Sequence, residues 1–171
     1  MTPAKGSRRT AKPRRTARAT VSGRTAAVPE RSARPSGAES ALLALARTLT
    51  ALASVESSPR GGVTTALNVL ATAFHAGAPL PGLLAEARIA AFGNKRRALA
   101  LAWAREQLRL SLGEILGRAA ASDELHVGLD AEPLAWLVLS ACEALADDPP
   151  QAGPDRIRLL AKWLTGAPAD G

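Results

Sequence analysis

Residues 128–150, GLDAEPLAWLVLSACEALADDPP, decide the fold because they predict a helix with apolar side chains on two opposite sides. At about 100° per residue, one face carries Leu134, Leu137, Val138, Ala141 and Leu145. Trp136 and Leu139 fall on the far side, among Ala135, Glu132 and Glu143. A peripheral helix of a small monomer needs only one apolar face, so another surface must cover the second.

The preceding predicted helix, residues 95–121, also has two apolar sides. One stripe consists of Leu101, Leu108, Leu112, Ile115 and Ala119, and the opposite stripe of Leu99, Trp103, Leu110 and Gly117. Two adjacent helices with surplus apolar faces can pair with the same helices of a second copy about a two-fold axis. We therefore expect a homodimer whose interface includes Leu99, Leu110, Gly117, Trp136 and Leu139. The alternative is a monomer that covers both faces internally.

The composition favours helices over strands along the whole chain. Aromatic residues make up 3% of it with no Tyr, and Ala and Leu outnumber the β-branched residues. Leu spacing and Gly/Pro breaks predict six helices, over residues 38–56, 63–77, 82–94, 95–121, 131–147 and 155–164. We expect an all-α multi-helix bundle over residues 39–165 and a flexible C-terminus over 166–171. Ser40 and Asp130 are expected to cap the first and fifth helices.

Basic residues are concentrated at the N-terminus. Residues 1–38 hold 10 Lys and Arg against one acidic residue, a net of +9, whereas residues 39–171 hold 12 basic and 14 acidic residues, a net of −2. Residues 1–38 contain too few large apolar side chains to offset the entropy of ordering, which predicts a disordered Arg-rich tail. Such a tail can contact DNA phosphates without reading sequence. The expected contacts are Arg8, Arg9, Arg14, Arg15 and Arg18.

Three other interpretations of this tail remain open. The first is a solvated segment with no partner. The second is a mitochondrial transit peptide, which is disfavoured because the Arg residues are not interleaved with Leu, Ile or Phe, so that no amphipathic helix is predicted. The third is a segment that is not a selected sequence, because Arg, Ala, Pro, Gly, Ser and Thr are what GC-rich DNA encodes in many frames.

The chemistry-bearing residues are isolated in the sequence. His75 and His126 lack the spacing of a metal site, Cys142 stands alone in an apolar helix, and no Gly-rich phosphate loop occurs. We therefore expect no enzyme activity, no metal and no cofactor. No apolar run approaches the roughly 20 residues of a membrane span, and a single Cys fits a reducing compartment. The expected location is the cytoplasm, without membrane association.

Three segments match loose family patterns. They are APLPGLLAEARI (78–89), RLSLGEILGRAAASDEL (109–125) and VGLDAEPLAWLVLSACEAL (127–145). In this order they resemble the C-terminal ligand-binding and dimerisation domain of bacterial tetracycline-repressor-type (TetR) regulators, and the resemblance covers residues 63–163. Glu124 and Leu125 stand where the family usually has Gly and an apolar residue, and Ala144 stands where it often has Gly.

The resemblance implies dimerisation and effector sensing. In the family the effector pocket lies among the helices upstream of the dimer pair, which here implies a pocket at Leu70, Phe74, His75 and Trp103. Its apolar lining suits a small hydrophobic ligand that is neutral or anionic.

The family's N-terminal helix-turn-helix has no counterpart in residues 1–62. We therefore do not expect sequence-specific operator binding. The leading hypothesis is a non-enzymatic regulator that senses an effector and dimerises. The alternatives are a truncated or frame-shifted copy of such a regulator without independent function, and a helical protein–protein interaction module with a nucleic-acid-binding tail.

Overall fold

The computed structural model describes residues 37–149 and 152–166, and within them it contains only helices. They are α1 (Gly37–Val55), α2 (Pro59–Phe74), α3 (Pro79–Ala91), α4 (Lys95–Ala121), α5 (Ala131–Glu143), the 3-10 helix η1 (Ala144–Asp147) and α6 (Ala152–Thr165). The expected all-α bundle is therefore confirmed. Residues 1–36 and 167–171 lie outside the described residues, so the expected disordered tail and flexible C-terminus stay predictions. Gly37 and Ala38 belong to α1 rather than to the tail.

Three helices, α2, α3 and α6, begin at least three residues earlier than the sequence patterns indicated, and in α2 and α3 the first residue is a proline. Pro59 opens α2 after Ser58, whose Oγ accepts a hydrogen bond from the backbone N–H of Gly61 at 3.1 Å. Pro79 opens α3. Because the first helical residue has no intrahelical use for its N–H, proline is well suited to that position. The SSPRGG and APLP segments, expected as breaks, are therefore helix starts.

The expected caps are only partly found. Ser40 lies inside α1, which begins at Gly37, so its predicted capping role is wrong. Asp130 does occupy the cap position of α5, but its side chain makes no capping hydrogen bond. Asn94 caps α4, since its Oδ1 accepts a hydrogen bond from the Arg97 N–H at 3.1 Å.

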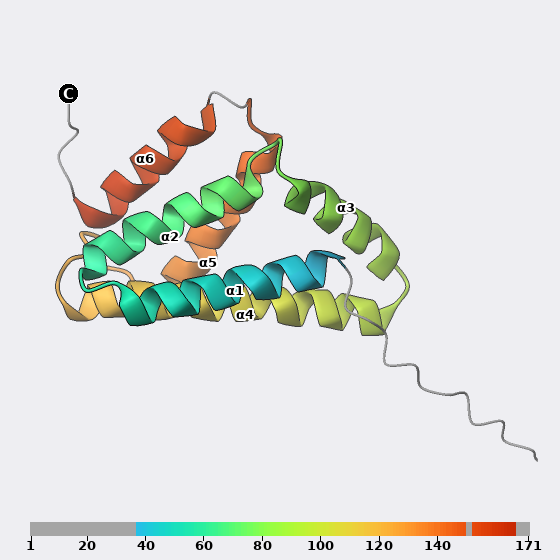
Figure 1. Cartoon of the computed structure of the whole chain (residues 1–171), viewed down its shortest axis with the longest axis horizontal. Coiled ribbons are helices and arrows are strands. Elements are labelled where there is room, and N and C mark those ends of the chain that lie inside the picture. The colour runs from blue at the N-terminus through green and yellow to red at the C-terminus, as the bar shows by residue number, and fades with distance from the viewer. Residues whose placement is uncertain (1–36, 150–151, 167–171) are drawn as a thin grey trace, which may run out of the picture. The chain divides into compact units, whose positions relative to one another are not determined.

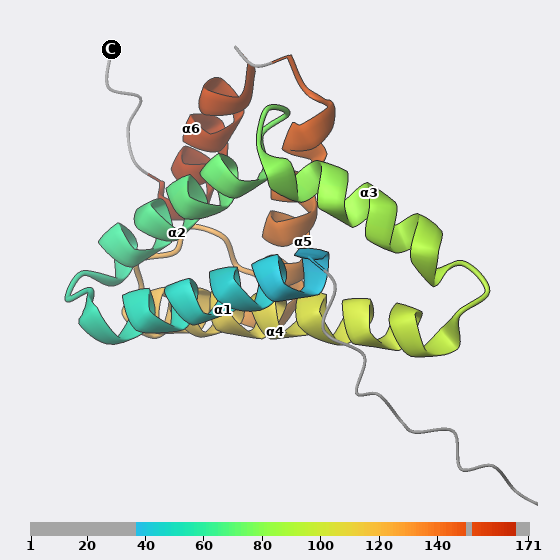
Figure 2. The same cartoon turned by 45° about the vertical axis from the view of Figure 1, so that its right-hand side comes forward.

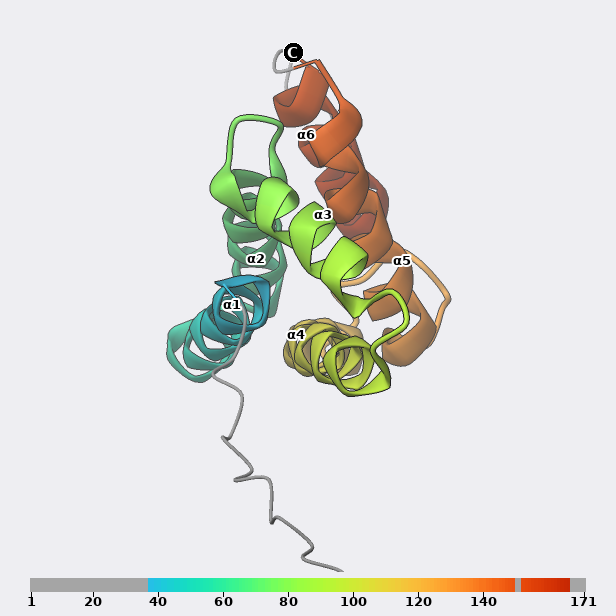
Figure 3. The same ribbon diagram turned by 90° about the vertical axis from the view of Figure 1, so that its right-hand side faces the viewer.

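Helix α4 is the centre of the bundle, with α1 and α5 packed on either side of it (Figures 1 and 3). Hydrogen bonds from Thr50 to Ser111 (3.0 Å between hydroxyl oxygens) and from Arg118 to the Glu56 carbonyl (3.3 Å) show that α1 and α4 run in the same direction. Helix α2 packs against α4 and α6, and α3 spans from α2 to the start of α4 (Figure 2). The largest fully buried side chains are Phe74, Leu42, Leu49, Leu67, Leu70, Leu108, Leu112, Leu116, Leu134, Leu139, Leu164 and Val63.

Helix α1 is long and apolar enough, by length and composition alone, to cross a bilayer. The bent pair α2 and α3 passes the same test when taken together. This test does not require an uninterrupted apolar run, so the expected absence of membrane association stays a prediction. In the bundle, however, Leu42, Ala46, Leu49 and Ala53 form a single buried stripe on α1 at helical spacing, which packs against α4.

Candidate functional site

Helices α4 and α5 are held close together by small residues. A Cβ built on Gly113 stands 3.7 Å from the Cβ of Ala135, and one built on Gly117 stands 3.8 Å from the Cβ of Ala131. Because the higher-numbered glycine of α4 contacts the lower-numbered alanine of α5, the two helices are antiparallel. Glycine permits this close approach of two helix backbones. Gly117, predicted to lie in a dimer interface, therefore serves packing within one chain.

Ion pairs fix the orientation of this helix pair. Arg105 on α4 donates two hydrogen bonds to the Glu143 carboxylate on α5, from Nε at 2.7 Å and from Nη2 at 3.2 Å. Arg109 bonds Glu106 within α4, and its Nη1 lies 3.8 Å from Glu132 Oε1 on α5. The hydrogen bond from Arg109 holds the pKa of Glu106 below its ordinary value and raises the pKa of Arg109. A bidentate guanidinium–carboxylate pair restrains rotation of one helix against the other.

One side of the α4–α5 pair carries large apolar side chains that no other part of residues 37–149 and 152–166 covers; we call it the outer face. It consists of Leu99, Trp103 and Leu110 on α4 and Trp136 on α5, which are 60%, 57%, 50% and 53% exposed. In two antiparallel helices, the residues that directly follow the contact positions point to the same side of the pair. This places Leu110 beside Trp136. Single exposed apolar residues are ordinary, but a group of four large ones makes this face a candidate interaction surface.

Leu139 does not belong to this face. It is fully buried, at 0% exposure. It continues the Ala131–Ala135 stripe by one helical turn, so it points at α4 and only about 60° away from Trp136 on the helical wheel. The prediction that Leu139 contacts a second chain is therefore wrong. Leu137, expected on the buried side, is instead 41% exposed.

Charged side chains are distributed unevenly along the outer face. Arg96 is exposed near the N-terminal end of α4, Glu106 is exposed near its middle between Trp103 and Leu110, and Glu114 is exposed in its C-terminal half. These positions follow one another at spacings of three and four with Leu99, Trp103 and Leu110, so they share one side of the helix. Arg96 and Glu114 make no salt bridge within residues 37–149 and 152–166. Because Glu106 is paired with Arg109, the unpaired charges of the face are Arg96 at one end and Glu114 at the other, with the apolar side chains between them.

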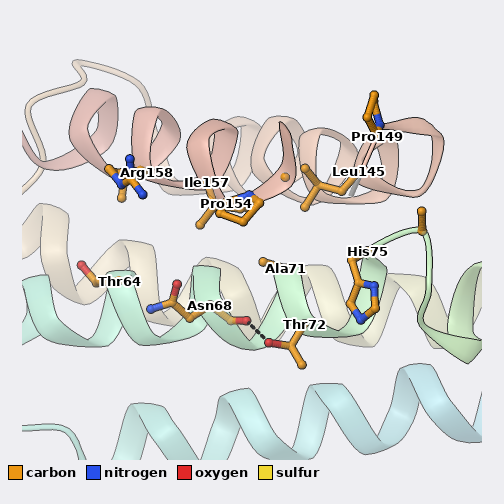
Figure 4. Close-up of a pocket in the computed structure, with 13 residues that line it drawn as sticks. Thr64, Asn68, Ala71, Thr72, His75, Leu145, Pro149, Pro154, Ile157 and Arg158 are labelled. Carbon is orange, nitrogen blue, oxygen red and sulfur yellow. Dashed lines mark hydrogen bonds between the residues drawn. The ribbon is translucent and has the colours of Figure 1, made fainter. Parts of the chain in front are cut away.

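A groove of about 640 Å³ lies between α2 and α6 (Figure 4). The side chains that line it come from α2, η1 and α6 and their connections: Thr64, Asn68, Ala71, Thr72, His75, Ala76, Leu145, Pro149, Gly153, Pro154, Ile157, Arg158 and Ala161. Arg158, Thr64 and Asn68 lie toward one end and His75 toward the other, with Ala71 between them.

The pocket expected at Leu70, Phe74, His75 and Trp103 is not assembled. Leu70 and Phe74 are buried in the core at 0% and 1% exposure, and Trp103 lies on the outer face of α4. His75 alone lines the groove described above. Asn68 also lines it. Leu145 and Ile157 were not predicted as lining residues, because nothing in the sequence places α6 beside α2.

The remaining chemistry-bearing residues form no cluster in the described part of the chain. No group of three His, Cys, Asp or Glu side chains there has the geometry to hold a metal ion. Cys142 is fully buried, and this burial raises the pKa of its thiol to about 12. The Arg residues expected to contact DNA, Arg8, Arg9, Arg14, Arg15 and Arg18, lie outside the described residues. No family model, curated protein or solved structure matches this chain.

Proposed function

We propose that this protein is a non-enzymatic regulator of tetracycline-repressor type that forms a homodimer through the outer face of α4 and α5, senses a small effector in the cytoplasm and contacts DNA through its basic N-terminal residues. The observation that carries the proposal is the group of exposed apolar side chains Leu99, Trp103, Leu110 and Trp136 on one side of a rigid helix pair. Aromatic and aliphatic side chains gathered in this way are typical of interface centres.

The charge distribution favours a second copy as the partner that covers this face. A two-fold axis crossing α4 just before its midpoint reverses the direction of the helix in the partner. Arg96 then faces the partner's Glu114, and Leu99 faces the partner's Leu110. Each contact occurs twice, so a face that is basic at one end and acidic at the other is complementary to itself.

A charge-reversal series tests this arrangement. Arg96→Glu and Glu114→Arg each place like charges opposite each other twice per dimer, and each should weaken dimerisation by roughly tenfold. The double variant restores opposite charges and should recover the wild-type dissociation constant. Sedimentation velocity over a concentration series measures all four proteins. Because both side chains are exposed, neither change should alter folding, which circular dichroism checks. A double variant as weak as the two single variants would contradict the antiparallel register.

The basic N-terminal residues are proposed to bind DNA through phosphates alone. If the five arginines named above neutralise roughly five phosphates, affinity should fall about 500-fold between 50 and 200 mM salt. Fluorescence anisotropy with several unrelated duplexes should give equal affinities, and removal of residues 1–36 should abolish binding. A truncated protein that still prefers one duplex would contradict this account.

A second candidate function is a helical module that binds a different protein. One observation favours it: α6 exposes Leu159 (67%) and Trp163 (46%) beside an apolar groove of about 550 Å³ against α5. If the chain stays monomeric at all concentrations while a partner protects Trp163, this candidate replaces the homodimer.

A further inference from the structure

The groove between α2 and α6 has polar groups at both ends and an apolar middle. We propose that it binds an elongated amphiphile, a medium-chain carboxylate whose charged end lies at Arg158 and whose other end carries a hydroxyl or carbonyl oxygen at His75. The inference rests on the proposed function only in giving this ligand the role of an effector. Binding itself is measured separately from dimerisation.

The size of the groove suits one small molecule. Its volume of about 640 Å³ falls within the range of small-molecule sites, roughly 300–1,000 Å³. Asn68 and His75 are seven residues apart on α2 and its C-terminal cap, which corresponds to roughly 10 Å at 1.5 Å per residue. A ligand that reaches both ends is therefore about 10 Å long, the length of a medium-chain acid.

The middle of the groove is apolar. Ala71 lies on α2 between the two ends, and the small size of its side chain leaves the space open. Leu145 from η1 and Ile157 from α6 are almost fully buried, at 4% and 6% exposure, and contribute apolar surface to the lining. A hydrocarbon chain placed here would be removed from water without burying a polar group of the protein.

At the far end of the groove, a hydrogen bond within the turn that follows α2 orients the His75 ring. Its Nδ1 accepts a hydrogen bond from the Gly77 N–H at 3.0 Å. In the neutral ring the proton is then carried by Nε2, which makes that nitrogen a donor. A hydroxyl or carbonyl oxygen can accept this hydrogen bond.

At the other end of the groove, the side chains have more N–H donors than the described residues have acceptors bonded to them. Arg158 uses Nη1 on Asp155 at 3.0 Å, an exposed ion pair that leaves its other N–H groups available. The Asn68 amide has no hydrogen-bond partner among the described residues, and neither Asp nor Glu occurs among the described lining residues. Asp155 offsets the charge of the guanidinium, but the remaining N–H groups of Arg158 and the Asn68 amide can donate hydrogen bonds to a carboxylate.

Calorimetry on the full chain with three probes tests the assignment: ω-hydroxydecanoate, decanoate and decylamine. The first should bind, the second should bind several-fold more weakly because it lacks the oxygen for His75, and the cationic amine should not bind. Arg158→Ala should weaken both acids by roughly tenfold, the effect of losing one charge-assisted hydrogen bond. Arg47→Ala removes an exposed cation from α1, outside the groove, and serves as the matched control with unchanged affinity.

Two further variants locate the ligand. Asp155→Asn frees Arg158 from its present partner and should strengthen binding of both acids, a direction that general destabilisation would not produce. Ala71→Leu fills the middle of the groove and should abolish binding of both acids, while circular dichroism verifies the fold.

Three results would overturn the proposal: no binding of either acid, equal affinities of the Arg158→Ala and Arg47→Ala proteins, or retained binding in folded Ala71→Leu. Sedimentation of the same samples keeps the two proposals apart. A dimer that binds no probe leaves the proposed function standing without this site, and a monomer that binds the acids does the reverse.

Discussion

Replacing Trp136 with glutamate should convert the dimer into a folded monomer. The side chain lies beside Leu110 on the outer face and is about half exposed in the single chain, so its loss removes apolar contact from the interface and leaves most of the core intact. An aromatic residue that anchors an interface typically contributes about 2 kcal/mol or more. Each substitution occurs twice in a two-fold dimer. We therefore expect a weakening of about 4 kcal/mol or more, roughly a thousandfold in the dissociation constant.

Sedimentation equilibrium measures this effect, and two other variants interpret it. Leu110→Glu lies on the same face and should also give monomer. Leu159→Glu introduces the same charge at an exposed leucine of α6, which is 67% exposed, and should leave the dimer intact. A Trp136→Glu protein that remains dimeric while Leu159→Glu dissociates would contradict the outer face and move the homodimer interface to α6.

The second large effect is on stability and separates Leu139 from its neighbours. Leu139 is at 0% exposure between α5 and α4, so Leu139→Ala should lower the free energy of unfolding by about 2–5 kcal/mol through lost burial and the cavity that remains. The matched change Leu137→Ala, at 41% exposure, should cost about 1 kcal/mol or less. Urea unfolding in a Trp136→Glu background keeps dimer dissociation out of the comparison.

The two leucines make this a direct test of which side of α5 faces the core. Equal losses of stability from Leu137→Ala and Leu139→Ala would mean that α5 is rotated relative to its position in the structure. A larger loss from Leu137→Ala would support the orientation that the helical wheel first indicated.

The bundle was largely predictable because its helices have strong apolar periodicity. The limits of α4, residues 95–121, agree with the prediction, since Asn94 caps the helix and Gly93 has the positive φ of a left-handed residue just before it (72°). The starts of α2 and α3 were not predictable, because a proline can either break a helix or open one. That choice depends on neighbours such as Ser58, whose capping contact becomes visible only in three dimensions.

The candidate sites were less predictable because they depend on angles and on distant segments. Leu139 and Trp136 differ by about 60° on the helical wheel, which is too little to assign one to the core and the other to the surface by pattern. Periodicity did identify Leu99, Leu110 and Trp136 as surplus apolar residues. The groove joins α2 with α6, and these segments are far apart in the sequence, so no local pattern could place Ile157 opposite Ala71.

The burial of Cys142 has a consequence for how this protein responds to oxidants. Thiol oxidation and disulfide exchange require the thiolate, and a pKa of about 12 leaves almost none at neutral pH while the sulfur stays buried. Since Cys142 is the one cysteine in the sequence, copies of the folded chain cannot be cross-linked through sulfur without first opening α5 away from the core. The Cys142 thiol is therefore protected from oxidants and from disulfide exchange for as long as the bundle stays closed.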